Sequence, residues 1–233
     1  MFTTQLELRL DSTTWGGRRA GAGRPCGRTA VAHALRDDFA PRHPVHVTLE
    51  VARTIPSLRT DWRVRHIRGV IAESHRDDFR IVHFGVMTNH LHLIIEAADR
   101  DALRSGIQGF KIRLAKCLNT LFERSGPVFG ERYHERVLKT PREVRHALRY
   151  VLNNFRHHTP QTLDRAWFDP YSSAPWFDGW STPLLLNTPA KRALASTPPP
   201  TRPATVWLLT TGWRRHGAIG VDEVPGPKRK QKK

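Results

Sequence analysis

Two apolar runs separated by a short polar turn constrain the fold of this chain more than any other feature. The runs are "RIVHFGVMT", which starts at residue 80, and "HLHLIIEA", residues 90–97, with Thr88 and Asn89 at the turn. Both runs are rich in residues that favour β-strands, and strands joined by two residues pair antiparallel. The segment therefore predicts a β-hairpin.

The segments on either side extend this hairpin into a longer series of elements. The stretch "HPVHVTLEVA", residues 43–52, alternates apolar and polar residues as a half-buried strand does. Apolar residues recur at helical spacing between residues 57 and 75 and again between residues 103 and 121. A fourth strand is predicted for "RYHERVLKT", residues 132–140.

The resulting order is strand, helix, strand, strand, helix, strand. This is the order of the ferredoxin-like α+β fold, in which one antiparallel sheet carries both helices on the same face. We therefore expect the other face of the sheet to be free.

A further helix follows the fourth strand, and its start is well marked. Thr140 is a suitable N-cap, Pro141 suits the first helical position, and Glu143 completes a capping box with Thr140. The apolar stripe of this helix consists of Val144, Ala147, Leu148, Val151, Leu152 and Phe155. We expect a ferredoxin-like βαββαβ domain with an additional C-terminal helix, spanning residues 42–158.

The charge of the chain indicates a polyanionic partner. Its 38 Lys and Arg residues against 21 Asp and Glu residues give a net charge of +17 at pH 7. Basic side chains displace the counterions of phosphates, so we expect the partner to be a nucleic acid.

Residues 1–41 are predicted to form a Gly/Arg-rich basic arm, and residues 159–233 a Pro-rich and basic C-terminal extension.

The composition disfavours several other classes of protein. Cys26 and Cys117 are too few for a disulfide framework or a cysteine-based zinc site, and they suit a reducing compartment. The sequence has no run of 18 apolar residues and no recognisable secretion signal. We therefore expect a soluble cytoplasmic protein that does not bind a membrane.

Two histidines in the second run of the hairpin are candidate metal ligands. Successive residues of a strand point to opposite sides, so His90 and His92 share one face, while Leu91 and Leu93 share the other. The histidine face would be the one that the helices leave free. Two imidazoles in this arrangement can bind a divalent metal ion. The alternative is a pair of solvated or locally hydrogen-bonded strand histidines.

The last helix carries two polar residues outside its apolar stripe. Tyr150 lies about 130° from the centre of the stripe, and Asn154 follows it on the same flank. If this flank of the helix lies against the open face of the sheet, the Tyr150 phenol and the Asn154 amide come close to the two imidazoles. The alternative is a border tyrosine that covers the edge of the core.

A phenol, an amide and two imidazoles are suited to breaking a phosphodiester. A phenolate can attack the phosphorus and form a phosphotyrosine, which conserves the bond energy and frees a 3′-hydroxyl. His90, His92 and Asn154 would hold Mg²⁺ or Mn²⁺ as a Lewis acid at the phosphate. The residues expected to bind the DNA backbone are Lys139, Arg142, Arg145, Arg149 and Arg156.

The chain resembles the HUH single-strand transposases that use one tyrosine, and especially their REP-associated branch. The resemblance covers residues 42–158 and rests on the motifs "VMTNHLHLIIEA", "VFGERYHERVLKT" and "TPREVRHALRYVLNNFRHH". It implies that His90 and His92 bind the metal ion, that Asn154 completes the metal site and that Tyr150 is the nucleophile. It also implies activity on single-stranded DNA, commonly on hairpins formed by palindromes.

The leading hypothesis is a metal-dependent single-strand DNA endonuclease and strand transferase that forms a 5′-phosphotyrosine at Tyr150. One alternative is a non-catalytic nucleic-acid-binding module on the same fold, either a DNA repressor or an RNA binder. Another is a hydrolase with water as the nucleophile, for which Tyr150 would be dispensable. The chain could act as a monomer, or as a homodimer in which each tyrosine completes the partner's site.

Overall fold

The central sheet has the topology expected from the sequence. The structure, a computed structural model, describes residues 39–130, 132–158 and 164–226. In this part of the chain, one sheet is built from β1 (Val45–Glu50), β2 (Phe79–Val86), β3 (His90–Ala97) and β4 (His134–Val137). The strand order is β2-β3-β1-β4, and every neighbouring pair is antiparallel. The predicted ferredoxin-like α+β fold is confirmed.

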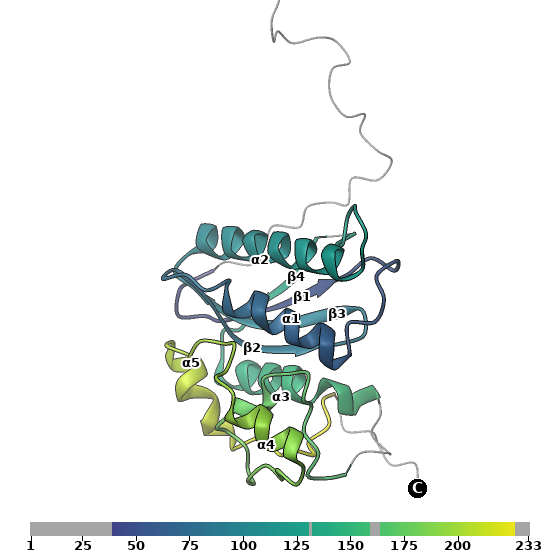
Figure 1. Cartoon of the computed structure of the whole chain (residues 1–233). Helices are drawn as coiled ribbons and strands as arrows, with labels where there is room; N and C mark the ends of the chain where they lie inside the picture. The colour runs from purple at the N-terminus through teal and green to yellow at the C-terminus, as the bar shows by residue number, and fades with distance from the viewer. Residues whose placement is uncertain (1–38, 131, 159–163, 227–233) are drawn as a thin grey trace, which may run out of the picture. The chain divides into compact units, whose positions relative to one another are not determined.

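Two helices cover one face of this sheet (Figure 1). They are α1 (Asp61–Ala72) and α2 (Arg100–Leu121), and the side chains of Thr60 and Asp99 cap their first turns. Alternate residues of β1, β2 and β3 form the buried apolar core beneath them. Among the described residues, no helix has both the length and the apolar character needed to cross a membrane.

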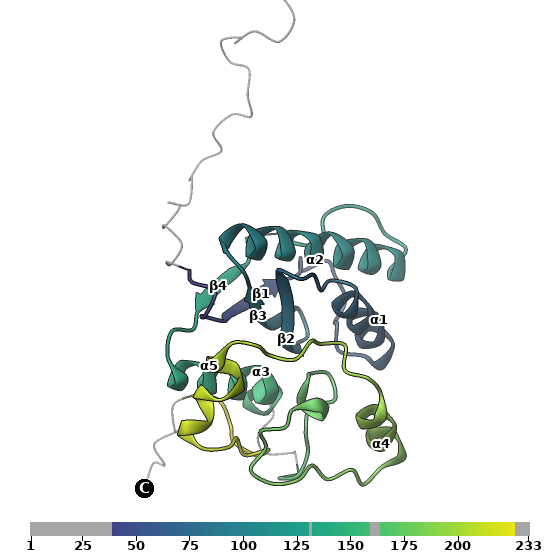
Figure 2. The same ribbon diagram turned by 90° about the vertical axis from the view of Figure 1, so that its left-hand side faces the viewer.

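The helix α3 (Pro141–His158) lies against the opposite face of the sheet (Figure 2). Its predicted capping box is present: the Glu143 N–H donates to Thr140 Oγ1 at 3.3 Å, and the Thr140 N–H donates to Glu143 Oε2 at 3.1 Å. Leu148 and Leu152 of its apolar stripe are fully buried. The start and the packing side of this helix are therefore those that the sequence predicted.

The opposite face of the sheet is covered, so the expectation of a free face is wrong. Residues 164–226 contribute η1 (Ala174–Trp176), α4 (Pro189–Ser196), α5 (Trp207–Thr210) and η2 (Gly212–His216). Together with α3, this segment encloses a second core that contains Val82 and Ile94 of the sheet and Trp213. Ile94 lies on the same face as His92, two residues away. An uncovered face would expose these apolar side chains to water, which explains the cover.

Two buried carboxylates fasten residues 164–226, the C-terminal segment, to the rest of the fold. Asp169 accepts two hydrogen bonds from the Arg59 guanidinium, both at 3.0 Å. Glu96 of β3 accepts hydrogen bonds from the backbone N–H groups of Thr205 and Val206. The segment thus belongs to the same compact unit as the sheet, whereas the predicted domain division after residue 158 stays a prediction. Most of the predicted basic arm lies outside the described residues.

Candidate active site

Two imidazoles meet at the start of β3. The Nε2 atoms of His90 and His92 lie 3.0 Å apart, and their ring planes make an angle of 81°. The His90 Nδ1 lies 2.9 Å from Asn89 Oδ1 in the preceding turn. Leu91 and Leu93 are buried in the core on the other side of the strand, as the alternation predicted. The two ring nitrogens are therefore directed at each other on the face that carries α3.

A third imidazole, which the sequence did not single out, contacts His92 from β1. The His92 Nδ1 lies 3.1 Å from Thr48 Oγ1 and 3.3 Å from His46 Nε2. The cause is the strand register, because Thr48 pairs directly with His92. Burial, and secondarily the charge of Arg136, lowers the pKa of His46 to about 4, so this imidazole is neutral at pH 7. It can accept a hydrogen bond from His92 and so fix the ring orientation.

Tyr150 of α3 lies beside these imidazoles. The centroid of its ring is 4.9 Å from that of His92 and 5.8 Å from that of His46. The helix lies close to the sheet at Gly85, which pairs with His92 across the hairpin. A Cβ atom at Gly85 would lie 2.5 Å from the Val151 carbonyl oxygen, so the approach requires a glycine. The structure thus brings the phenol and the imidazoles together.

Replacing Gly85 with alanine is expected to destabilise the protein by about 1–3 kcal/mol, because the added methyl group would overlap with the backbone of α3. The midpoint of urea unfolding measures this loss. Gly69 of α1 provides the control, since a Cβ atom there would meet no atom within 4 Å and alanine favours a helix. Gly69→Ala should leave the midpoint unchanged or raise it. Equal midpoints for wild type and Gly85→Ala would show that α3 does not pack closely against Gly85.

The side chain of Asn154 is buried and has no hydrogen-bond partner among the residues that the structure describes. It lies one helical turn after Tyr150, hence on the same side of α3, and it is 2 % exposed. Within the described ranges, neither its amide oxygen nor its amide nitrogen has a hydrogen-bond partner. Buried polar groups are nearly always paired, because an unpaired one costs about 1–3 kcal/mol. The amide is therefore available to bind a ligand.

The donor atoms of this site fit a divalent metal ion with six ligands. Two ligands at right angles around an ion about 2.1 Å away lie about 3.0 Å apart. The Nε2 atoms of His90 and His92 have this separation, which also suits an N–H···N hydrogen bond. No group of three or more His, Cys, Asp or Glu side chains in the described part of the chain could hold a metal ion. The Asn154 amide, a substrate phosphate and water molecules would therefore have to complete the ligand shell.

The five basic residues expected to bind the DNA backbone fall into two groups. Arg145 and Arg149 each form an ion pair of 2.9 Å with Glu223. Arg156 is 4 % exposed and donates to three backbone carbonyl oxygens of the C-terminal segment. The exposed pair is Lys139 and Arg142. The first group holds the fold together, and the second is directly accessible to a phosphate backbone.

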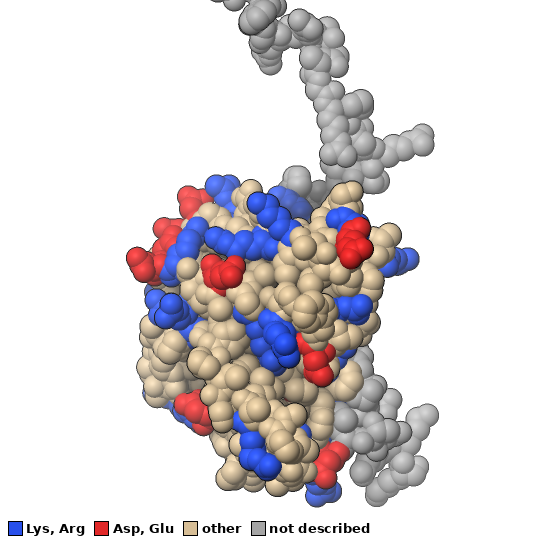
Figure 3. Space-filling model, in the orientation of Figure 1, with Lys and Arg blue, Asp and Glu red and all other residues tan. Residues whose placement is uncertain are grey.

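Basic side chains are also spread over the face that α1 and α2 form (Figure 3). They lie in several groups with acidic side chains between them. No single path for a polyanion stands out on this face. The site around Tyr150 lies on the opposite side of the sheet, so the positive charge near it comes from its own surroundings.

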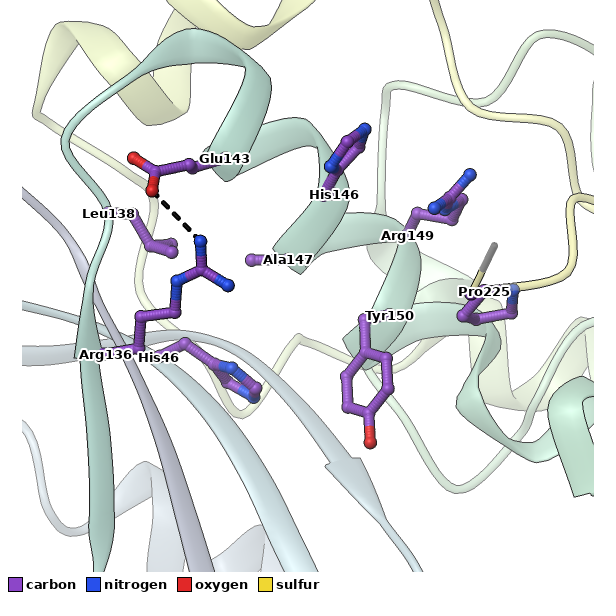
Figure 4. A pocket seen from close by; sticks show the side chains of 10 residues that line it. His46, Arg136, Leu138, Glu143, His146, Ala147, Arg149, Tyr150 and Pro225 are labelled. Atoms are coloured by element: carbon purple, nitrogen blue, oxygen red, sulfur yellow. Dashed lines mark hydrogen bonds and ion pairs between the residues drawn. The ribbon is translucent and has the colours of Figure 1, made fainter. Parts of the chain in front are cut away.

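A cavity of about 340 Å³ lies beside Tyr150 (Figure 4). Its wall includes His46, Arg136 and Arg149. The Arg136 guanidinium donates to Glu143 Oε1 at 3.0 Å, and Arg149 pairs with Glu223 as described. The cavity is large enough for a nucleotide-sized group next to the phenol, with two guanidinium groups in its wall.

Solved structures of transposases resemble this chain. One is a REP-associated tyrosine transposase bound to a REP hairpin, with 18 % identity, a TM-score of 0.45, and coverage of 60 % of this chain and 81 % of the other. Another, from Deinococcus radiodurans R1, is described as a presumptive transposase, with 14 % identity, a TM-score of 0.36, and coverage of 41 % and 78 %. No family model and no curated protein matches the chain. The chain is similar to transposases, as its motifs predicted.

Proposed function

We propose that this protein is a metal-dependent single-strand DNA endonuclease and strand transferase of the transposase kind. The observation that carries the proposal is the contact of the Tyr150 ring with His92, whose Nε2 meets that of His90. A potential nucleophile thus lies beside two potential metal ligands on one face of the sheet, although Tyr150 is distant from both histidines in the sequence. The Asn154 amide, which has no hydrogen-bond partner in the described part of the chain, supports the same assignment.

In the proposed reaction, Tyr150 Oη attacks the scissile phosphorus. The bond between phosphorus and the 3′ oxygen breaks, so the downstream strand becomes linked to the protein as a 5′-phosphotyrosine. The phenol loses its proton, and the departing 3′ oxygen gains one. Attack of a 3′-hydroxyl on the phosphotyrosine reverses the step without an external energy source. Strand transfer follows when the attacking hydroxyl belongs to another strand.

His90, His92 and Asn154 would hold Mg²⁺ or Mn²⁺, which as a Lewis acid stabilises the charge on the phosphate oxygens. Thr48 and His46 orient His92 through its Nδ1. The close packing of α3 on the sheet positions the phenol. Lys139 and Arg142 would contact the strand through its phosphates.

We further propose that the substrate is a DNA hairpin or palindrome and that the site works within one chain. The similar transposase bound to a REP hairpin supports such a substrate, as does the net charge of +17. Tyr150 contacts the His92 of its own chain, so a complete site does not require a partner subunit. A cleavage-competent monomer is the expected form.

The test uses full-length protein, a pool of single-stranded hairpin oligonucleotides labelled at either end, and Mn²⁺. A 5′-phosphotyrosine retains the downstream strand, so a 3′ label should stay on the protein through a denaturing gel, while a 5′ label should not. EDTA should prevent both cleavage and adduct formation. Binding without an adduct across the pool would favour the non-catalytic module. Cleavage without an adduct would favour a hydrolase with water as the nucleophile.

A further inference from the structure

A second cavity, of about 390 Å³, lies between β2 and the C-terminal segment. It shares no lining residue with the cavity beside Tyr150. Aromatic rings of Trp176, Phe177 and Trp213 line it, with Arg202 and Arg214 among the basic residues. We call it the aromatic cavity. Its size is within the range of sites for small ligands, about 300–1,000 Å³.

His83 of β2 presents a polar atom to this cavity. Its Nδ1 lies 3.2 Å from Ser173 Oγ, and its ring packs edge-on against Phe177 at a centroid distance of 5.5 Å. The hydrogen bond of this ring to Ser173 involves Nδ1, which leaves Nε2 to face a ligand. Burial lowers the pKa of His83 to about 4, although the Asp178 charge opposes this. The neutral ring can either accept or donate a hydrogen bond, depending on its tautomer.

The walls of the aromatic cavity combine flat rings with guanidinium groups. Phe177 and Trp213 pack at a centroid distance of 5.5 Å, and the Arg214 guanidinium lies 4.6 Å from the centre of a Trp213 ring. Arg214 is neutralised by an ion pair of 2.8 Å with Asp178. The exposed Arg202 has no such partner within the described ranges, so its charge is available to an anion.

We propose that the aromatic cavity binds an unpaired nucleobase of a DNA strand, with His83 at the polar edge of the base and Arg202 at its phosphate. Proteins hold unstacked bases between aromatic and arginine side chains and recognise them by hydrogen bonds at the base edge. The aromatic cavity offers both features. The inference goes beyond the proposed cleavage, because it assigns a recognition site in which no bond is broken.

The experiment uses a Tyr150→Phe background, so that binding is measured without cleavage. The probe is a DNA hairpin with one unpaired 2-aminopurine, whose fluorescence falls when it stacks on tryptophan. We expect quenching and tighter binding than for the same hairpin with an abasic site. Arg202→Gln should weaken binding of the base-bearing hairpin about tenfold. Arg215→Gln, an exposed control outside the aromatic cavity, should leave it unchanged.

A second variant, His83→Leu, should remove the preference for the base-bearing hairpin over the abasic one. If this variant does not fold, the comparison between Arg202→Gln and Arg215→Gln decides alone. If the protein with an unmodified aromatic cavity bound the base-bearing and abasic hairpins equally tightly, the proposal would be overturned. Equal losses of affinity in Arg202→Gln and Arg215→Gln would also overturn it. Tighter binding of a free deoxynucleoside monophosphate than of the hairpin would also overturn it. None of these outcomes depends on the covalent adduct, so the two proposals fail separately.

Discussion

Replacing Tyr150 with phenylalanine is expected to abolish the covalent adduct and to lower strand cleavage by about 10³-fold or more. The substitution removes the proposed attacking oxygen and keeps the ring that packs against His92 and His46. Binding of the hairpin should therefore stay within about twofold of wild type. Adduct formation is read from a denaturing gel with 3′-labelled DNA, and binding from fluorescence anisotropy.

The other tyrosines of the chain provide matched controls for this variant. The chain has three tyrosines, and neither Tyr133 nor Tyr171 lines the cavity beside Tyr150. Tyr133→Phe and Tyr171→Phe should both retain the adduct. Loss of the adduct in one of them, with retention in Tyr150→Phe, would move the nucleophile to another site. Cleavage that continues in Tyr150→Phe without an adduct would identify water as the nucleophile.

Local sequence patterns were sufficient to predict the main elements of the fold. The alternation of apolar residues located β3 at residues 90–97, as observed. The capping residues Thr140 and Glu143 located the start of α3. Such signals arise between residues close in the sequence, so they can be recognised in one chain. The helix expected over residues 57–75 is shorter, because Thr60 caps it and Ala72 is its last residue.

Contacts between distant residues account for what the sequence could not predict. His46 and Thr48 alternate with apolar residues, but only the strand order places β1 beside β3 and both residues near His92. The C-terminal segment has little hydrophobic periodicity, so its packing over the second face could not be read from the sequence. Likewise, nothing in the helix pattern indicates that Arg145 pairs with Glu223.

Replacing Asn154 with leucine is expected to raise the free energy of unfolding by about 1–2 kcal/mol and to lower cleavage by about 10²-fold. The gain in stability arises because leucine has a similar volume and removes a buried amide that lacks a partner among the described residues. The loss of activity arises because the same amide is the proposed third protein ligand of the metal ion. Urea unfolding measures the first effect, and the yield of adduct measures the second.

The adjacent Asn153 distinguishes a metal ligand from a structural amide. It is also 2 % exposed, but its Nδ2 donates to the backbone oxygens of Gly220 and Glu223 at 3.0 and 3.1 Å. Asn153→Leu should therefore destabilise the protein by about 1–3 kcal/mol and keep the stabilisation that Mn²⁺ confers. Asn154→Leu should reduce that Mn²⁺-dependent stabilisation. If Asn154→Leu instead destabilises the protein as much as Asn153→Leu and responds fully to Mn²⁺, Asn154 supports the fold and does not bind the metal ion.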